Sequence, residues 1–273
     1  MSYRCLLAIR PVLIPSPRDS EMAKPQLGTA TQVYVLDRAT DKTILEMIQS
    51  GAVLIRRFGQ RDQLLKLASS MGELMQPGVG MPPELHDGFV YTVQVRNEGS
   101  GLNDVHGNPI ISSTNRAFSL HTDGFNLQVP PRFVLLLRVD NDGQSTPTVV
   151  SSIEKALARL PGLRNSIESL MMPSARGPVR FSEFTANHLS PRYRVNMEEV
   201  ERWRDVSDAC LAEESDDVLA ELGSALNAVS TAVVLEPTDI LVLDNWRMCH
   251  GRPQLSKDSR RRLERVWVAS RQA

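Results

Sequence analysis

The sequence has little cysteine. Only Cys5, Cys210 and Cys249 occur among its 273 residues, and no two of them form a CxxC pair. Such a small, unpaired set argues against a disulfide framework and against a structural zinc site built from cysteines. We therefore expect a protein of a reducing compartment, with a cytoplasmic location.

Long apolar runs and an excess of one charge are also lacking. No run of about 18 apolar residues is present, so we expect no membrane span. Arg10 and Pro11 interrupt the apolar stretch CLLAIRPVLIP, and no small-residue cleavage site follows, so we expect no signal peptide. The net charge is −1, and basic residues gather only in SRRRLER. A small-molecule substrate is therefore the expected partner, rather than nucleic acid or a membrane, and the oligomeric state stays open.

The sequence contains many β-type segments and a few helical ones. RFVLLLRVD, at 132–140, is typical of a buried strand, whereas RDQLLKLASSMGEL, at 61–74, has helical spacing. Ser151 or Ser152 is expected to cap a helix that closes at Pro161. Strands are further predicted over 52–58, 90–95, 146–152, 177–184, 191–196, 231–245 (two strands) and 263–270, and helices near 41–51 and over most of 196–228.

These segments predict a mainly β protein with flanking helices, in which helices pack outside an antiparallel β core. No internal repeat is present, and residues 1–273 are expected to form a single domain. Residues 1–30 are rich in proline and serine and are predicted to be a loose N-terminal extension. The segments 76–115 and 172–195 are predicted to be active-site loops.

The stretch LHTDG places His121 and Asp123 two residues apart. On a helix these positions point about 200° apart, whereas on a strand they share a face, so the pair can bind one metal only if LHTDG is extended. His250 follows an apolar strand far downstream. Two histidines and one carboxylate match the facial triad of non-heme Fe(II) oxygenases. A chance HxD pair, a strand-end histidine and a zinc hydrolase with the same ligands are the alternatives.

Arginines near the C-terminus offer a second site. Arg261 and Arg265 stand four apart, and if 261–269 is extended both point to the same face as Leu263 and Trp267. A guanidinium can hold a carboxylate with two hydrogen bonds and stays charged when buried, which suits the distal carboxylate of 2-oxoglutarate. The alternative is a solvated basic strand edge.

The motifs LHTDG, PPRFVLLLRVD, STPTVVS, DILVLDNWRMCHGRP and RRRLERVWV occur in this order. In order and spacing they resemble, over about residues 42–268, the taurine dioxygenase / clavaminate synthase-like superfamily of Fe(II)/2-oxoglutarate oxygenases. DNWRMCHGRP is similar to the distal-histidine motif DNxxxxHGR of its amino-acid-hydroxylating members. The resemblance implies a double-stranded β-helix, the jelly-roll or cupin-like fold.

The resemblance also implies roles for single residues. His121, Asp123 and His250 match the iron ligands. Thr148 and Arg261 match the pair that binds 2-oxoglutarate. In relatives, the arginine at the position of Arg265 faces the cosubstrate or an anionic group of the substrate. The carboxylate of Asp123 argues against halogenation, because halogenating relatives carry a small residue there.

The expected function is therefore that of a dioxygenase with Fe(II), 2-oxoglutarate and O2. It is predicted to hydroxylate a small polar metabolite, namely an amino acid or an amino-acid-derived natural-product intermediate. Ser113, Asn115, Arg192 and Arg265 are the predicted substrate contacts. A desaturase or epoxidase acting on a peptide-like or cyclic-peptide intermediate, and a non-redox metal-binding jelly roll (a hydrolase or a sensor), remain alternatives.

Overall fold

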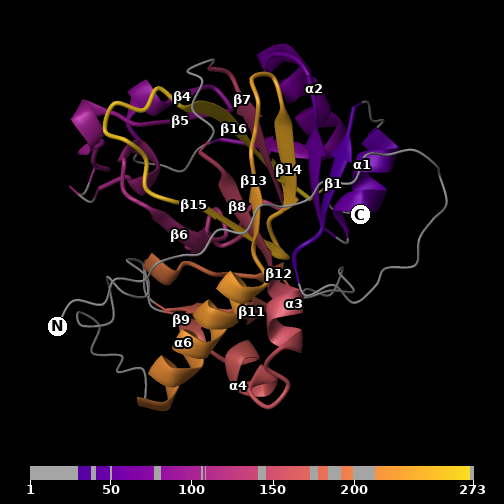
Figure 1. The fold of residues 1–273 in the computed structure, drawn as a ribbon, viewed down its shortest axis with the longest axis vertical. Helices are drawn as coiled ribbons and strands as arrows, with labels where there is room; N and C mark the ends of the chain where they lie inside the picture. The colour runs from indigo at the N-terminus through magenta and orange to yellow at the C-terminus, as the bar shows by residue number, and fades with distance from the viewer. Residues whose placement is uncertain are drawn as a thin grey trace.

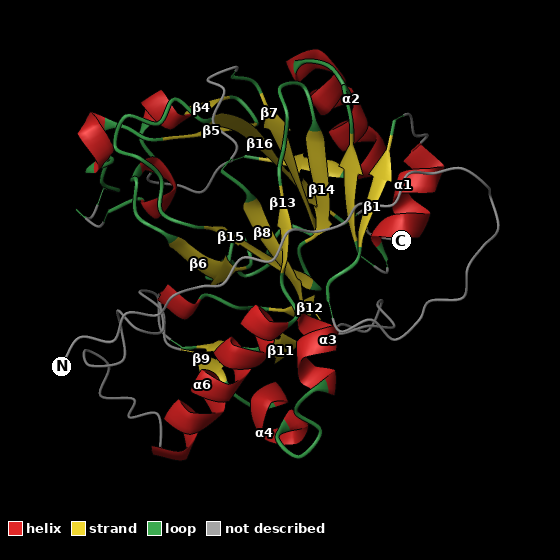
Figure 2. Cartoon of the chain, viewed as in Figure 1, coloured by secondary structure: helices red, strands yellow, loops and turns green. Residues whose placement is uncertain are grey.

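Two facing β-sheets, with helices on both outer sides, make up the computed structural model (Figures 1 and 2). The predicted β core with helices outside it is confirmed. Among the residues that the structure describes, no helix combines the length and the apolar character that crossing a bilayer requires. The structure describes residues 30–37, 41–49, 51–76, 81–105, 107, 109–140, 146–172, 178–183, 192–198 and 213–270, so the predicted N-terminal extension lies outside them except for its last residue.

The larger sheet is antiparallel except at one edge, where its first two strands pair in parallel. Its strands, in spatial order, are β1 (Val33–Leu36), β2 (Ala52–Ile55), β14 (Ile240–Asp244), β7 (Phe133–Arg138), β16 (Arg262–Ala269), β5 (Val90–Gln94) and β4 (His86–Asp87), and β3 (Glu73–Met75) also pairs with β16.

The smaller sheet is antiparallel and carries the two histidine motifs. Its order is β13 (Thr231–Val233), β8 (Thr148–Ser152), β15 (Met248–Arg252) and β6 (Phe118–His121). Strands distant in sequence thus lie side by side: β15 pairs with β8 on one side and β6 on the other. Together the two sheets form the expected double-stranded β-helix.

Alternating side chains explain how the layers stack. In β7, Phe133, Leu135 and Leu137 belong to the cluster beneath the helices α1 (Asp41–Ile48) and α2 (Arg61–Met71). Val134 and Leu136 point the other way, into the cluster between the two sheets. Because successive side chains of a strand face opposite sides, a strand covered on both faces reads as one apolar run.

The outer face of the smaller sheet is covered by the helices α3 (Ile153–Ala158), α4 (Arg164–Glu168) and α6 (Glu213–Ala228). The predicted cap of α3 is confirmed, because Ser152 Oγ accepts a hydrogen bond of 3.3 Å from the Lys155 N–H. Short elements complete the described chain: β9 (Met171–Met172) with β10 (Val179–Arg180), β11 (Ser182–Glu183) with β12 (Arg192–Tyr193), and the 3-10 turns η1 (Pro83–Leu85), η2 (Asn97–Gly99) and η3 (Ile111–Ser113).

Two segments differ from the prediction. The strand expected over 52–58 ends at Ile55, because Arg57 adopts a positive φ of 49° and the chain turns there. No strand was predicted over Met248–Arg252, yet these residues form β15 between two partner strands. Much of the predicted 196–228 helical region lies outside the described residues, and its described end forms α6.

Asp244, at the end of β14, is a buried carboxyl group with a shifted pKa. Its Oδ1 accepts a hydrogen bond of 3.2 Å from the Trp246 backbone N–H, and Arg132 Nε lies 3.9 Å from its Oδ2. Burial raises the pKa of Asp244 to about 6, against the lowering effect of Arg132. The folded protein therefore favours the neutral acid at this position.

Asp244→Asn is expected to stabilise the protein above pH 6 and to change little below about pH 4. The folded-state pKa lies above the unfolded one, so the contribution of the neutral acid is complete below about pH 4 and is lost as the pH rises through about 6. Urea unfolding at several pH values should show that the free energy of unfolding of the variant exceeds that of the native protein by up to about 3 kcal/mol. Asp258→Asn, at an exposed carboxylate, is the control. A gain that is equal at all pH values would contradict this account.

Candidate active site

Two histidines face each other across β6 and β15. His121 ends β6 and is paired in register with His250, and their ring centroids lie 4.4 Å apart. Phe118 stacks on the His121 ring at 3.8 Å between centroids. His121 Nδ1 donates a hydrogen bond of 2.8 Å to the carbonyl of Ser119, so in the neutral ring Nε2 carries the lone pair.

Asp123 lies just beyond the strand, in a turn, rather than within an extended LHTDG as expected. A residue far along the chain sets its backbone: Asn245 Oδ1 accepts a hydrogen bond from the Asp123 N–H (2.7 Å), and Asn245 Nδ2 donates to the Asp123 carbonyl (3.0 Å). Thr122 is held by reciprocal hydrogen bonds with Val195. Gly124 then adopts a φ of +66°, a conformation that favours glycine, and the chain turns.

His121, Asp123 and His250 each offer one ligand atom, and these atoms lie within 4.8 Å of one another. All three side chains are buried, and His121 Nε2 and His250 Nδ1 have no hydrogen-bond partner among the described residues. Buried polar atoms without partners are unfavourable and therefore rare. Two imidazoles and one carboxylate around a common point fit a divalent transition metal, which would satisfy His121 Nε2.

The charges of the three groups also suit a metal. Burial alone would raise the pKa of Asp123, but Arg265 and the two histidines hold it well below its usual range, so the carboxylate stays ionised. Burial and the neighbouring His121 lower the pKa of His250 to about 3. A neutral imidazole and an ionised carboxylate are the forms that bind metals.

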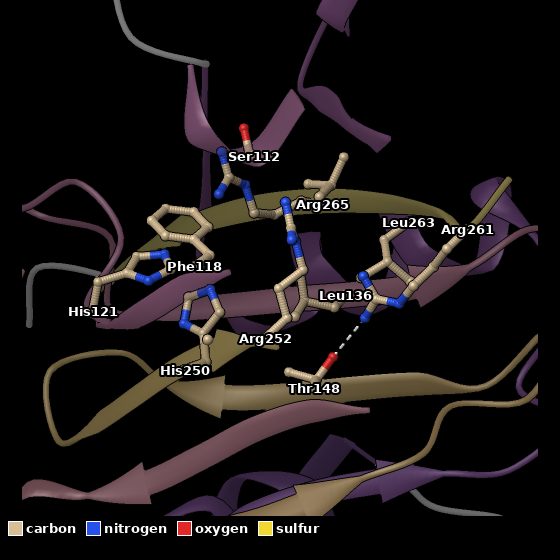
Figure 3. A pocket seen from close by; sticks show the side chains of 12 residues that line it. Ser112, Phe118, His121, Leu136, Thr148, His250, Arg252, Arg261, Leu263 and Arg265 are labelled. Atoms are coloured by element: carbon tan, nitrogen blue, oxygen red, sulfur yellow. Dashed lines mark hydrogen bonds between the residues drawn. The ribbon is translucent and has the colours of Figure 1, made fainter. Parts of the chain in front are cut away.

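His121 and His250 line a cavity, and Arg261 and Thr148 also lie on its wall (Figure 3). Arg261 Nη2 donates a hydrogen bond of 2.8 Å to Thr148 Oγ1, and both side chains are buried. Arg261 directly precedes β16 and Thr148 begins β8, so the two sheets each supply one member. A buried guanidinium beside a hydroxyl is suited to hold a carboxylate.

Arg265 also lines the cavity, but its partner is Asp123. Its Nη1 donates to Asp123 Oδ1 at 2.8 Å, and its guanidinium lies over the rings of Tyr91 (4.4 Å) and Trp267 (4.9 Å). Trp267 Nε1 donates to Asp123 Oδ2, also at 2.8 Å. Arg265 and Trp267 lie on one face of β16, as predicted. The Arg265 guanidinium, however, contacts Asp123, an expected metal ligand, rather than Arg261.

Ser113 and Asn115, two of the predicted substrate contacts, serve the backbone of their own loop. Ser113 Oγ donates to the carbonyl of Ile110 (2.7 Å) and accepts from the Leu102 N–H (2.8 Å). The main-chain N–H and carbonyl of Asn115 are both hydrogen bonded to other parts of the chain. Neither residue lines the cavity, whereas Ser112 does.

Arg192, the third predicted contact, also lies away from the cavity wall. Its Nη2 is 2.6 Å from Glu183 Oε2, and Arg194 reaches the same carboxylate at 3.0 Å. Arg194 further donates to backbone carbonyls of the loop that follows Asp123, among them that of Gln128. Arg192 thus belongs to an ion-pair cluster with Glu183 and Arg194, and its contact with a substrate stays a prediction.

The predicted active-site loops therefore contribute unequally. Segment 76–115 supplies Val93 and Ser112 to the cavity wall, whereas no described residue of 172–195 reaches it. Residues 77–80, 106, 108, 173–177 and 184–191 lie outside the described chain.

Arg252 was not among the predicted site residues, although it follows the distal histidine in the HGR motif. Its side chain lines the cavity and donates to the carbonyls of Arg116, Ile111 and Thr114. Burial lowers its pKa to about 10. Arg252 thus fixes the turn that carries Ser112 onto the cavity wall. The signal in the sequence that could have identified Arg252 is its position directly after His250 and Gly251.

Comparison with known proteins bears directly on this site. The family model "Taurine catabolism dioxygenase TauD, TfdA family" matches residues 22–267. The chain belongs to this family. The predicted resemblance is thereby confirmed, and the protein is a dioxygenase dependent on Fe(II) and 2-oxoglutarate, as its family is. A search of curated proteins gives no match.

Several solved structures of oxygenases share the fold. PvcB, an Fe, alpha-ketoglutarate dependent oxygenase from an isonitrile synthetic pathway, is 20% identical, with a TM-score of 0.60 over 86% of this chain and 82% of that one. Asparagine oxygenase, with Fe(II), 3-hydroxyasparagine and succinate, is 17% identical (TM-score 0.59; 84% and 79%). A taurine dioxygenase from Burkholderia xenovorans is 16% identical (TM-score 0.61; 88% and 87%). At these identities the likeness concerns the fold alone.

Gly251 permits the close approach of β6 and β15 on which the histidine pair depends. A Cβ at this position would meet the Phe118 carbonyl oxygen at 2.5 Å and the Ser119 carbonyl oxygen at 3.1 Å. Gly251→Ala is therefore expected to push β6 away from β15 and to separate His121 from His250. We expect Co(II) affinity, measured by titration, to fall about tenfold or more.

Gly162→Ala is the matched control, because a Cβ there meets nothing within 4 Å. It should leave Co(II) affinity unchanged. Co(II) binding by the Gly251 variant equal to that of the native protein would show that the strand spacing does not set the ligand geometry.

Proposed function

We propose that His121, Asp123 and His250 hold Fe(II), that Arg261 and Thr148 hold the distal carboxylate of 2-oxoglutarate, and that the enzyme hydroxylates a small amino-acid-type metabolite. One observation carries this proposal: three buried ligand atoms lie within 4.8 Å of one another, beside a cavity that also contains the Arg261–Thr148 pair. A site that only bound metal would have no use for that pair.

Iron and 2-oxoglutarate, when bound, supply the oxidising chemistry: O2 is consumed, 2-oxoglutarate becomes succinate and CO2, and one oxygen atom is left for the substrate. The chain supplies binding and orientation. Arg261 and Thr148 orient the cosubstrate from the far wall of the cavity. The apolar walls at Leu136 and Leu263 limit the water near the reacting atoms.

The charge of the cavity supports an anionic substrate group. Three arginines, Arg252, Arg261 and Arg265, line it. Guanidinium groups on the wall of a cavity favour an anionic group of the substrate, such as a carboxylate. Two structural neighbours are complexes with hydroxylated amino acids, 3-hydroxyasparagine and (3S)-hydroxy-L-arginine, which agrees with an amino-acid substrate.

A cytoplasmic enzyme with a small-molecule substrate is part of the same proposal. Three cysteines without a CxxC pair support a reducing compartment. The enclosed position of the three ligand residues, each buried, supports a substrate small enough to enter the cavity rather than a macromolecule.

Arg261→Ala is expected to weaken 2-oxoglutarate binding while leaving metal binding intact. It removes a charged donor for the distal carboxylate, a loss of about 1.5–3 kcal/mol and therefore of about 10- to 100-fold in affinity. Anaerobic titration of the Fe(II)-loaded protein with 2-oxoglutarate measures this directly. Arg260→Ala, at an exposed neighbour, is the control and should bind normally. An equal loss of Fe(II) and 2-oxoglutarate in the Arg261 variant would mean that the arginine is structural.

The reaction is tested with oxygen, Fe(II), 2-oxoglutarate and a panel of free amino acids and small peptides. We expect succinate in proportion to a product heavier by one oxygen atom, and the loss of both in Asp123→Ala and His250→Ala. A product lighter by two hydrogen atoms would replace hydroxylation with desaturation. No succinate with any substrate in the Fe(II)-loaded native protein would refute the oxygenase proposal.

A further inference from the structure

The carboxylate of Asp123 has a hydrogen-bond donor on each oxygen. Arg265 Nη1 lies 2.8 Å from Oδ1, and Trp267 Nε1 lies 2.8 Å from Oδ2. Both donors come from β16, two residues apart, so they project from the same face of that strand. We name the two donors together the β16 clamp.

The β16 clamp is fixed to the larger sheet. Trp267 is only 9% exposed, its indole belongs to the cluster between the sheets, and its backbone is in register with Val134 on one side and Met75 on the other. The Arg265 guanidinium in turn lies against the rings of Tyr91 and Trp267. Asp123, by contrast, follows β6 of the smaller sheet. The clamp therefore reaches across the space between the sheets to hold a side chain of the other sheet.

The two donors have different physical effects. Arg265 brings a positive charge, which favours the ionised form of the Asp123 carboxylate whatever the orientation of that carboxylate. The indole N–H is neutral and directional, so it restrains rotation of the carboxylate about the Cβ–Cγ bond. Each carboxylate oxygen has two lone pairs, so one donor on each leaves lone pairs for a metal. Outer hydrogen bonds of this kind orient metal ligands.

We infer that Trp267 is a positioning residue, which fixes the plane of the Asp123 carboxylate for metal binding. This inference rests on the proposed function, because it assumes that Asp123 is a metal ligand. A carboxylate held by a donor on each oxygen has little freedom to turn away from the metal. Removal of the indole N–H should leave the charge supplied by Arg265 in place but free the carboxylate to rotate.

The experiment removes the N–H in two ways. Trp267→Phe deletes the indole, and site-specific replacement of Trp267 by 3-benzothienylalanine exchanges only the N–H for sulfur and keeps the ring shape. Trp246→Phe is the matched control, because Trp246 is also buried (6% exposed) and its Nε1 donates to the Pro130 carbonyl (3.2 Å) rather than to Asp123. Co(II) alone is the probe: titration gives the affinity, its visible absorption bands report the arrangement of the ligands, and thermal unfolding without metal checks the fold.

Both Trp267 variants should bind Co(II) about tenfold more weakly or worse and show altered absorption bands. The Trp246 variant should match the native protein in both measurements. Native affinity and native bands in a folded 3-benzothienylalanine variant would overturn the inference. Weak binding by the Phe variant alone would also overturn it, because packing rather than the N–H would then be responsible. If the native protein itself bound no Co(II), the proposed function would fail with it.

Discussion

A carboxylate buried between two sheets organises this molecule. Asp123 is only 5% exposed, and an ionised carboxylate without partners is strongly unfavourable in such surroundings. Its oxygens are met by Arg265 and Trp267 from the larger sheet, while its backbone is held by Asn245. The smaller sheet supplies the two histidines beside it. Strands β6, β15 and β16 therefore bring their site residues together at this single group.

The layered packing buries apolar side chains, and this burial offsets the cost of burying the Asp123 carboxylate. Helices cover the outer faces of both sheets, and the cluster containing Leu136 and Leu243 fills the space between them. With this apolar interior in place, polar groups gather at the cavity beside the triad. Several of them are held by other chain segments: Thr148 by Arg261, and the Arg252 Nη atoms by backbone carbonyls. Among the described residues, four buried nitrogens of cavity-lining side chains have no hydrogen-bond partner, namely His121 Nε2, His250 Nδ1, Arg252 Nε and Arg265 Nε.

Local patterns predicted much of this structure, and the failures have a common cause. β7 and α2 were predictable because their apolar residues recur with the period of their own element. β15, with the sequence Met-Cys-His-Gly-Arg, has little β propensity, and pairing with β8 and β6 makes it a strand. Asp123 leaves the strand because a distant amide, that of Asn245, captures its backbone. Partners so distant in sequence cannot be recognised from the residues that surround Asp123 or β15.

The arginines show the same limit for function. Arg252, Arg261 and Arg265 line one cavity, yet their partners differ: backbone carbonyls, the Thr148 hydroxyl and the Asp123 carboxylate. Residue type alone could not separate these tasks, just as it could not reveal that Arg192 contacts Glu183. Three guanidinium groups on the wall of one cavity nevertheless favour the entry of anions, the cosubstrate first among them.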